Sequence, residues 1–135
     1  MKDTKTVLSK FTRTAMLALT VATTLSPMPS AFAAAVATDS RNGAWGVAYS
    51  NEGTPSEQVT RAKNRAGGNA TYIRSAQFSV PAGCWVAYAT GYVGGKGWCG
   101  NWSIDPNPNV ALQKACDGLY RQGATRVVLQ NYWKE

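Results

Sequence analysis

The sequence predicts an α+β fold, with one small antiparallel or mixed sheet and two helices on one face of it. Three observations lead to this prediction. Aromatic and β-branched residues recur at period two in several short stretches, two helices begin with a proline behind a capping residue, and similar residues recur 53 positions apart. Period-two stretches are typical of strands, and proline is favoured at the first helical position. The fold is therefore expected as a pseudo-repeat of two strand-helix-strand units, forming a single domain over residues 44–135.

Five stretches have the composition of strands, and they are residues 44–50, 70–80, 84–90, 98–104 and 125–132. The stretch 84–90 is the richest in aromatic and β-branched residues, which strands favour. The stretch 70–80 alternates apolar and polar side chains, as an edge strand does. The glycine-rich segment 91–97 is expected as a turn between two strands.

The two helices are predicted from their first residues. Thr54 can cap a helix that has Pro55 at its first position and Glu57 where a capping-box acid reaches back. Gly67 is placed to end this helix near residue 66. Asn107 and Pro108 repeat the start for a second helix that runs to about residue 122, where leucine and alanine recur with helical spacing.

An ungapped offset of 53 residues relates the two halves. It aligns Trp45 with Trp98, Pro55 with Pro108, and several strand and helix positions between them. Agreement of a tryptophan, a helix start and helix core positions at one offset indicates an internal duplication. Two such halves would bury their apolar helix faces on one shared sheet.

The N-terminus has the order of a secretory signal peptide, predicted to span residues 1–33. Four cations precede an uncharged run over residues 15–25, and Ala31 and Ala33 occupy the small-residue positions of a cleavage site. The run has 11 residues, against about 20 needed to cross a bilayer. We therefore expect no membrane span and an exported protein, periplasmic or secreted, whose residues 34–43 form a flexible leader.

Charge excludes one class of partner. The chain carries a net charge of +7, and residues 1–33 account for +3 of it, which leaves +4 on the mature part. These charges are few and scattered, whereas nucleic-acid binding proteins cluster many cations on one face. No nucleic-acid partner is expected.

Three cysteines, Cys84, Cys99 and Cys116, lie in the mature part, and the sequence has no histidine. An exported domain meets an oxidising compartment, so one disulfide is expected. If residues 84–90 and 98–104 form a hairpin, Cys84 and Cys99 lie too far apart to bond, whereas Cys116 on a buried helix face can reach Cys99. We predict Cys99–Cys116 with Cys84 as the odd thiol. Zinc needs about four ligands, so no metal and no cofactor are expected.

Several short motifs together resemble a known family. They are Trp-Gly-x-Ala-Tyr-Ser at Trp45–Ser50, Cys-x-Val-x-Tyr at Cys84–Tyr88, Trp-Cys-Gly at Trp98–Gly100, Ala-Leu-x-x-Ala-Cys at Ala111–Cys116 and Arg-Val-Val-Leu at Arg126–Leu129. This pattern is similar to the small exported bacterial domain of unknown function numbered four-one-eight-nine. The resemblance implies two strand-helix-strand units and an exported protein, and it supplies no catalytic residues. The sequence departs from the pattern in having no cysteine in its first helix, Arg126 at the start of its last strand, and residues 70–80 as an apparent insertion.

Catalytic machinery is poorly represented. Without histidine, neither a Ser-His-Asp triad nor a Cys-His pair can form. A glycosidase pair made by Glu52 and Asp105 stays open, because the repeat could bring these acids together. Solvated loop acids are the favoured interpretation, so no catalytic residue is assigned.

An aromatic set marks the candidate binding residues, Tyr92, Trp98 and Trp102. They either fill the core of a small domain or form a platform for a ligand, since tyrosine and tryptophan supply binding energy at interfaces. The favoured function is an exported non-enzymatic binding protein, such as an inhibitor or immunity-type partner of an envelope protein. The alternatives are a module that binds cell-wall carbohydrate and a secreted effector or hydrolase that uses carboxylates. The expected partner is an envelope or extracellular protein or glycan.

Overall fold

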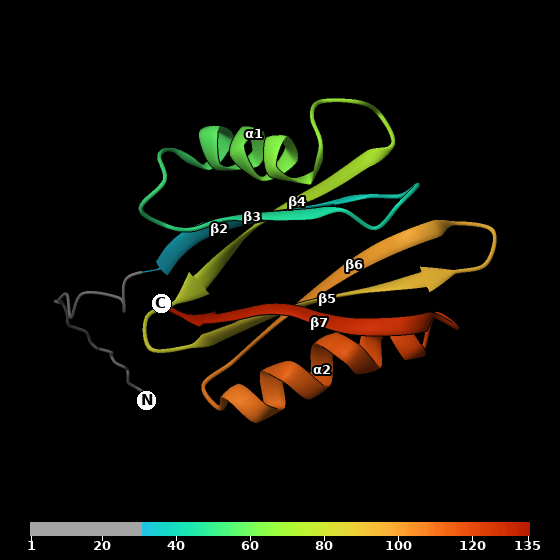
Figure 1. Ribbon diagram of the computed structural model, residues 1–135. Helices are drawn as coiled ribbons and strands as arrows, with labels where there is room; N and C mark the ends of the chain where they lie inside the picture. Colours follow the sequence, from blue (N-terminus) through green and yellow to red (C-terminus); the bar gives the residue numbers. More distant parts are fainter. Residues whose placement is uncertain (1–30) are drawn as a thin grey trace, which may run out of the picture. The chain divides into compact units, whose positions relative to one another are not determined.

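The computed structural model describes residues Ala31–Glu135, which form two antiparallel three-stranded sheets and two helices (Figure 1). The α+β class is confirmed, but the strands make two sheets rather than the single predicted sheet. The first sheet has the order β3-β2-β4, and its strands are β2 (Ala31–Asp39), β3 (Trp45–Ala48) and β4 (Ile73–Pro81). The second has the order β6-β5-β7, with β5 (Trp85–Val93), β6 (Gly97–Asp105) and β7 (Thr125–Lys134). The helices are α1 (Pro55–Ala66), after β3, and α2 (Pro108–Tyr120), after β6.

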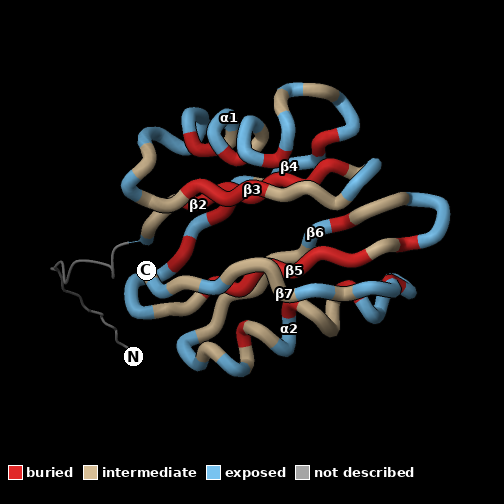
Figure 2. The backbone as a smooth tube through the Cα atoms, viewed as in Figure 1, coloured by how far each residue is buried: buried red, intermediate tan, exposed pale blue. Residues whose placement is uncertain are grey.

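Three hydrophobic clusters hold these elements together as helix, sheet, sheet and helix. One cluster joins α1 to the first sheet, one lies between the inner faces of the two sheets, and one joins the second sheet to α2. Figure 2 shows that the buried residues concentrate on β2 and β5, the central strands of the two sheets. The helices therefore cover opposite sheets rather than one common face, because each packs on the sheet formed by its own half of the chain.

The two halves of the described chain have the same topology, and the repeated unit is longer than predicted. Each half runs strand, strand, helix, strand, with its first strand at the centre of its sheet. The helices α1 and α2 begin 53 residues apart, and β2 and β5 begin 54 residues apart. The segment 70–80 is therefore no insertion, since it contains β4, the counterpart of β7.

The predicted flexible leader at residues 34–43 is wrong. Residues Ala34–Asp39 belong to β2, are buried, and pair with both β3 and β4. The stretch is rich in alanine and lacks the large β-branched and aromatic residues that indicate a strand. Its small side chains instead let α1 approach one face and the second sheet the other.

The predicted signal peptide lies outside the described residues except for Ala31–Ala33. These three residues pair with the end of β4, and full burial begins only at Ala34. The described part of the chain contains no helix with the length and apolar character to cross a membrane.

The starts of both helices and the end of α1 are confirmed as predicted, whereas α2 ends at Tyr120, before the predicted residue 122. Thr54 Oγ1 accepts a hydrogen bond from the backbone N–H of Glu57 at 3.2 Å, and the Glu57 carboxylate accepts one from Thr54 N–H at 2.8 Å. Gly67 ends α1 with φ of 136°, a conformation that favours glycine. The side chain of Asn107 caps α2 by accepting from Asn109 N–H at 2.9 Å.

The turn between β5 and β6 is shorter than the predicted segment 91–97. Strand β5 continues to Val93, and β6 begins at Gly97. Gly91 consequently pairs with Cys99, and Tyr92 pairs with Trp98. This register decides where the candidate aromatic residues lie.

Candidate functional site

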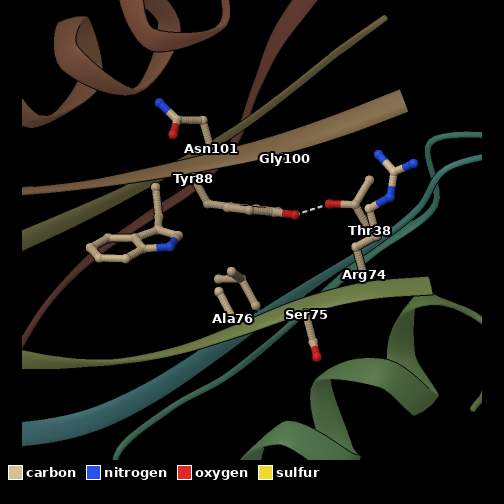
Figure 3. Close-up of a pocket in the computed structure, with 9 residues that line it drawn as sticks. Thr38, Arg74, Ser75, Ala76, Tyr88, Gly100 and Asn101 are labelled. Atoms are coloured by element: carbon tan, nitrogen blue, oxygen red, sulfur yellow. Dashed lines mark hydrogen bonds between the residues drawn. The ribbon is translucent and has the colours of Figure 1, made fainter. Parts of the chain in front are cut away.

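A cavity of about 130 Å³ opens between the two sheets at the edges formed by β4 and β6 (Figure 3). Both strands are edge strands, each paired on one side only. The cavity is lined by Val36, Thr38, Arg74, Ser75, Ala76, Tyr88, Gly100, Asn101 and Trp102. In Figure 3, Ser75 and Asn101 point away from it, so these two residues contribute backbone.

The floor of the cavity is a pair of buried hydroxyl groups. Thr38 Oγ1 and Tyr88 OH are hydrogen-bonded to each other, and Tyr88 is only 1% exposed. Burial raises the pKa of Tyr88 to about 12, so the phenol stays protonated at neutral pH. Two hydroxyls carry two protons, and their mutual bond uses one. Among the described residues no acceptor serves the other proton, which leaves a hydrogen-bond donor at the floor.

Gly100 allows the backbone of β6 to pack closely against this pair. A Cβ atom at Gly100 would collide with Tyr88 OH and Thr38 Oγ1. Glycine inside a strand often marks a close approach of this kind. The equivalent position in the first half, 53 residues earlier, is the buried residue Val47. The two halves have therefore diverged at this residue of the cavity lining.

Arg74 is the positively charged residue in the cavity lining. It is the Cα partner of Thr38 across the β2–β4 pair, and opposite residues on one sheet face lie about 5 Å apart. Its Nη2 donates to the backbone oxygen of Lys96 at 3.3 Å, and its Nη1 contacts Cys99 Sγ at 3.8 Å. No carboxylate is among the lining residues. The site therefore carries positive charge without a compensating acid.

Trp102 forms an apolar wall. Its ring stacks on Phe78 of β4 with the centroids 4.1 Å apart and the planes 13° from parallel. The stack belongs to the cluster between the sheets, so it also fixes the separation of β4 and β6 at this point. Trp102 is the one predicted ligand-binding residue that lines the cavity.

Tyr92 and Trp98 lie elsewhere, at the hairpin end of β5 and β6. Their rings contact edge to face with centroids 5.8 Å apart. The Arg126 guanidinium carbon lies 5.0 Å from the Tyr92 ring centroid and 5.3 Å from that of Trp98, within cation–π range. Both residues are half-buried, and Tyr92 lies within β5 rather than in the turn predicted for residues 91–97. Trp98 is four residues from Trp102 along β6, roughly 13 Å, so the three aromatics form no common platform.

The predicted Cys99–Cys116 disulfide is not formed, and all three cysteines are free. Both residues pack with the cluster between the second sheet and α2. Asn101 Nδ2, however, donates to the backbone oxygen of Ala115 at 2.9 Å and so fixes where α2 crosses β6. Cys99 lies two residues from that crossing, about 7 Å along the strand. Cys84 packs on the opposite face, between the sheets.

The acids Glu52 and Asp105 each form an ion pair with a helix of their own half. Glu52 is bound by Arg65 of α1, whose guanidinium holds the pKa of that carboxyl below its usual range. Asp105 accepts from Asn107 N–H and from Lys114 of α2, and these bonds lower its pKa. Each acid ties a helix to the preceding strand of its own half. Neither would hold the proton that a glycosidase acid must donate.

In the part of the chain that the structure describes, no three acidic, cysteine or histidine side chains lie close enough together to bind a metal ion. Of the nine lining residues only Trp102 was predicted from the sequence, and the missed ones include the four that give the cavity its chemistry, Thr38, Arg74, Tyr88 and Gly100. A glycine inside an aromatic strand, aligned with Val47 by the offset of 53, was the available signal. Comparison with known proteins gives no match to this chain, whether to a family model, a curated protein or a solved structure.

Proposed function

We propose that the protein is an exported, non-enzymatic binding protein, and that its partner is a protein that inserts one side chain into the cavity between β4 and β6. The observation that carries this proposal is the buried hydroxyl pair of Thr38 and Tyr88, which lines the cavity next to Gly100. A buried donor without an acceptor costs free energy, so it is retained where a ligand supplies the acceptor. Export is inferred from the signal-peptide pattern of residues 1–33.

The size of the cavity argues for a macromolecular partner. Pockets for small-molecule ligands are about 300–1,000 Å³, and this one is about 130 Å³. A cavity of this size takes one side chain rather than a whole metabolite. The rest of such a ligand would lie across the unpaired edges of β4 and β6, where exposed strands can bind an extended segment.

The lining residues support binding rather than catalysis. They include no carboxylate and no thiol, and the one arginine is not a general base. The phenol of Tyr88 has a pKa of about 12, too high for a base at neutral pH. Cys99 touches Arg74 only from the other face of β6. A binding role is what these groups can perform.

The test is affinity capture with matched glycine variants. The exported protein is used as bait against envelope and medium proteins of its source. Gly100→Ala places a methyl group on the hydroxyl pair, whereas Gly94→Ala makes the same change at a position with no neighbour within 4 Å. We expect a specific protein to be retained by the parent and Gly94→Ala and lost from Gly100→Ala.

Two results would contradict the proposal. One is retention of the same proteins by all three baits, with Gly100→Ala folded by circular dichroism. The other is a cell-wall glycan that quenches tryptophan fluorescence in the parent and Gly94→Ala but not in Gly100→Ala. The second result would establish the carbohydrate-binding alternative, since Trp102 lines the cavity.

A further inference from the structure

We infer that the group this cavity takes is the carboxylate of an acidic side chain on the partner protein. The inference rests on the proposed function and names the chemistry of its site. Two kinds of donor converge there, the guanidinium of Arg74 and the hydroxyl pair of Thr38 and Tyr88 (Figure 3). A carboxylate is the protein side chain that accepts from both, because its two oxygens offer about four acceptor sites.

Arg74 has more N–H donors than it has acceptors among the described residues. A guanidinium carries five N–H donors, and the contacts of Arg74 within the described residues are one backbone oxygen at 3.3 Å and one sulfur at 3.8 Å. Three other cations in the same part of the chain have carboxylate partners, namely Arg41 with Asp39, Arg65 with Glu52 and Lys114 with Asp105. Arg74 is the cation that faces the cavity, and no acid lines the cavity with it.

The neighbouring charge has the same sign. Lys96 presents its backbone oxygen to Arg74, so its residue lies beside the mouth. The mature part carries a net charge of +4. Such a field favours the approach of an acidic segment and disfavours a basic one.

The charge of Arg74 gives the site its selectivity between an acid and an amide. The hydroxyl oxygens could accept from the NH₂ group of an amide, but a neutral amide brings no negative charge to the guanidinium. A carboxylate presents an acceptor in both directions. Charge-assisted hydrogen bonds are also roughly twice as strong as neutral ones. The site should therefore prefer glutamate or aspartate to glutamine or asparagine.

The experiment uses a short oligoglutamate peptide with blocked ends and an oligoglutamine peptide of the same length. Binding is followed by intrinsic tryptophan fluorescence and by calorimetry at low ionic strength. We expect the parent to bind oligoglutamate at least about 10-fold more tightly than oligoglutamine, as one charge-assisted hydrogen bond provides. Arg74→Gln should abolish the preference. Arg74→Lys should keep part of it, because lysine has the charge but lacks the planar guanidinium that binds a carboxylate through two parallel hydrogen bonds.

Two controls separate the cavity from general attraction. Arg61→Gln removes the same charge from an exposed position of α1, away from the cavity lining, and should keep the preference. Gly100→Ala leaves Arg74 in place and covers the hydroxyl pair, and it should lose the preference. Equal loss in Arg74→Gln and Arg61→Gln, or no preference in the parent, would overturn the inference. Tighter binding of oligogalacturonate than of oligoglutamate would overturn it as well, since the carboxylate would then belong to a glycan.

The inference and the proposed function fail in different ways. If the parent protein captures an exported protein through the cavity but shows no preference for oligoglutamate, the proposed function holds and the carboxylate inference fails. If the parent protein prefers oligoglutamate through Arg74 but captures no exported protein, the carboxylate inference holds and the proposed function fails.

Discussion

At the scale of single residues, the cavity depends on a few side chains that also stabilise the fold. Trp102 lines the cavity and stacks on Phe78 in the cluster between the sheets. Tyr88 donates or accepts at the floor while its ring lies 6.3 Å from that of Trp45 in the same cluster. Substitutions at these positions therefore change stability and binding together, which is why the exposed residue Arg74 is a better probe of binding.

The first prediction concerns Trp102→Ala. Removing a half-buried indole from the Phe78 stack should destabilise the protein by about 3 kcal/mol, at the lower end for large aromatic residues. Denaturant unfolding measures the change. Tyr120→Ala is the control, because Tyr120 is 58% exposed and its loss should change stability by less than about 0.5 kcal/mol. A Trp102→Ala variant as stable as the parent would show that the stack contributes nothing to the core.

The second prediction concerns the acid dependence of stability at Glu52. Arg65 lowers the pKa of this carboxyl in the folded protein, below the value of about 4.3 in the unfolded chain. The ion pair therefore stabilises the protein above about pH 4.5, and its contribution is lost as the pH falls through the folded pKa. Glu52→Gln should lower the melting temperature at pH 7, and the difference from the parent should shrink below about pH 4. A difference that is constant with pH, or equal to that of Asp117→Asn, would contradict the assignment.

The third prediction concerns the thiols. Because the crossing of α2 over β6 is fixed at Asn101 and Ala115, Cys99 and Cys116 should both remain reduced. Alkylation of the unfolded protein without reductant should label three cysteines. Peptide mapping that finds a Cys99–Cys116 link would restore the disulfide expected from the sequence and require α2 to shift along the strand.

At the scale of elements, local signals define the helices, and small residues decide how closely they pack. Helix α1 lies directly on β3, where a Cβ at Gly46 would collide with the backbone oxygen of Ala62. Helix α2 buries Ala111, Ala115 and Leu119 on the second sheet. Both helices begin with a cap and a proline, so each starts at a defined residue even though its packing face is mostly alanine.

The fourth prediction tests the cap of α1. Thr54→Ala removes the oxygen that accepts from Glu57 N–H and breaks the capping box. It should destabilise the protein by about 1 kcal/mol. Ser56→Ala is the matched control, two residues further on and exposed, and it should change the free energy of unfolding by less than about 0.5 kcal/mol. Equal effects of the two substitutions would mean that the capping hydrogen bond does not contribute to the free energy of unfolding.

At the scale of the whole molecule, the two halves depend on each other. The cluster between the sheets takes residues from both halves, including Val36 and Phe78 from the first and Val86 and Tyr88 from the second. The cavity likewise draws on both halves, since Arg74 and Thr38 come from the first sheet and Gly100 and Trp102 from the second. The two halves have the same topology, but Gly100 stands where the first half has Val47, and the cavity is lined at Gly100.

The fifth prediction concerns processing. We expect the exported protein to begin at or near Ala34, where the buried part of β2 starts, so that the central strand of the first sheet is retained. Intact-mass analysis of the exported protein measures this. A mature chain that begins after Asp39 would lack β2 and contradict the fold, and a chain that retains Met1 in a membrane pellet would contradict the signal peptide.

Local structure was predictable from the sequence alone. The caps at Thr54 and Asn107, the prolines that follow them, the terminating Gly67 and most strand positions depend on neighbours within a few residues, and these were predicted correctly. The offset of 53 also indicated the duplication before any contact was known.

The number of sheets, the place of β2 and the cavity depend on long-range packing and were not predictable from local sequence. Strand pairing joins residues far apart in the chain, and nothing local states whether two halves share a sheet or stack two. The alanines of β2 resemble the end of a signal peptide, and their burial follows from the helix and the sheet that close over them. Thr38, Arg74, Tyr88 and Gly100 come from four strands, so their meeting is a property of the packed molecule rather than of any segment.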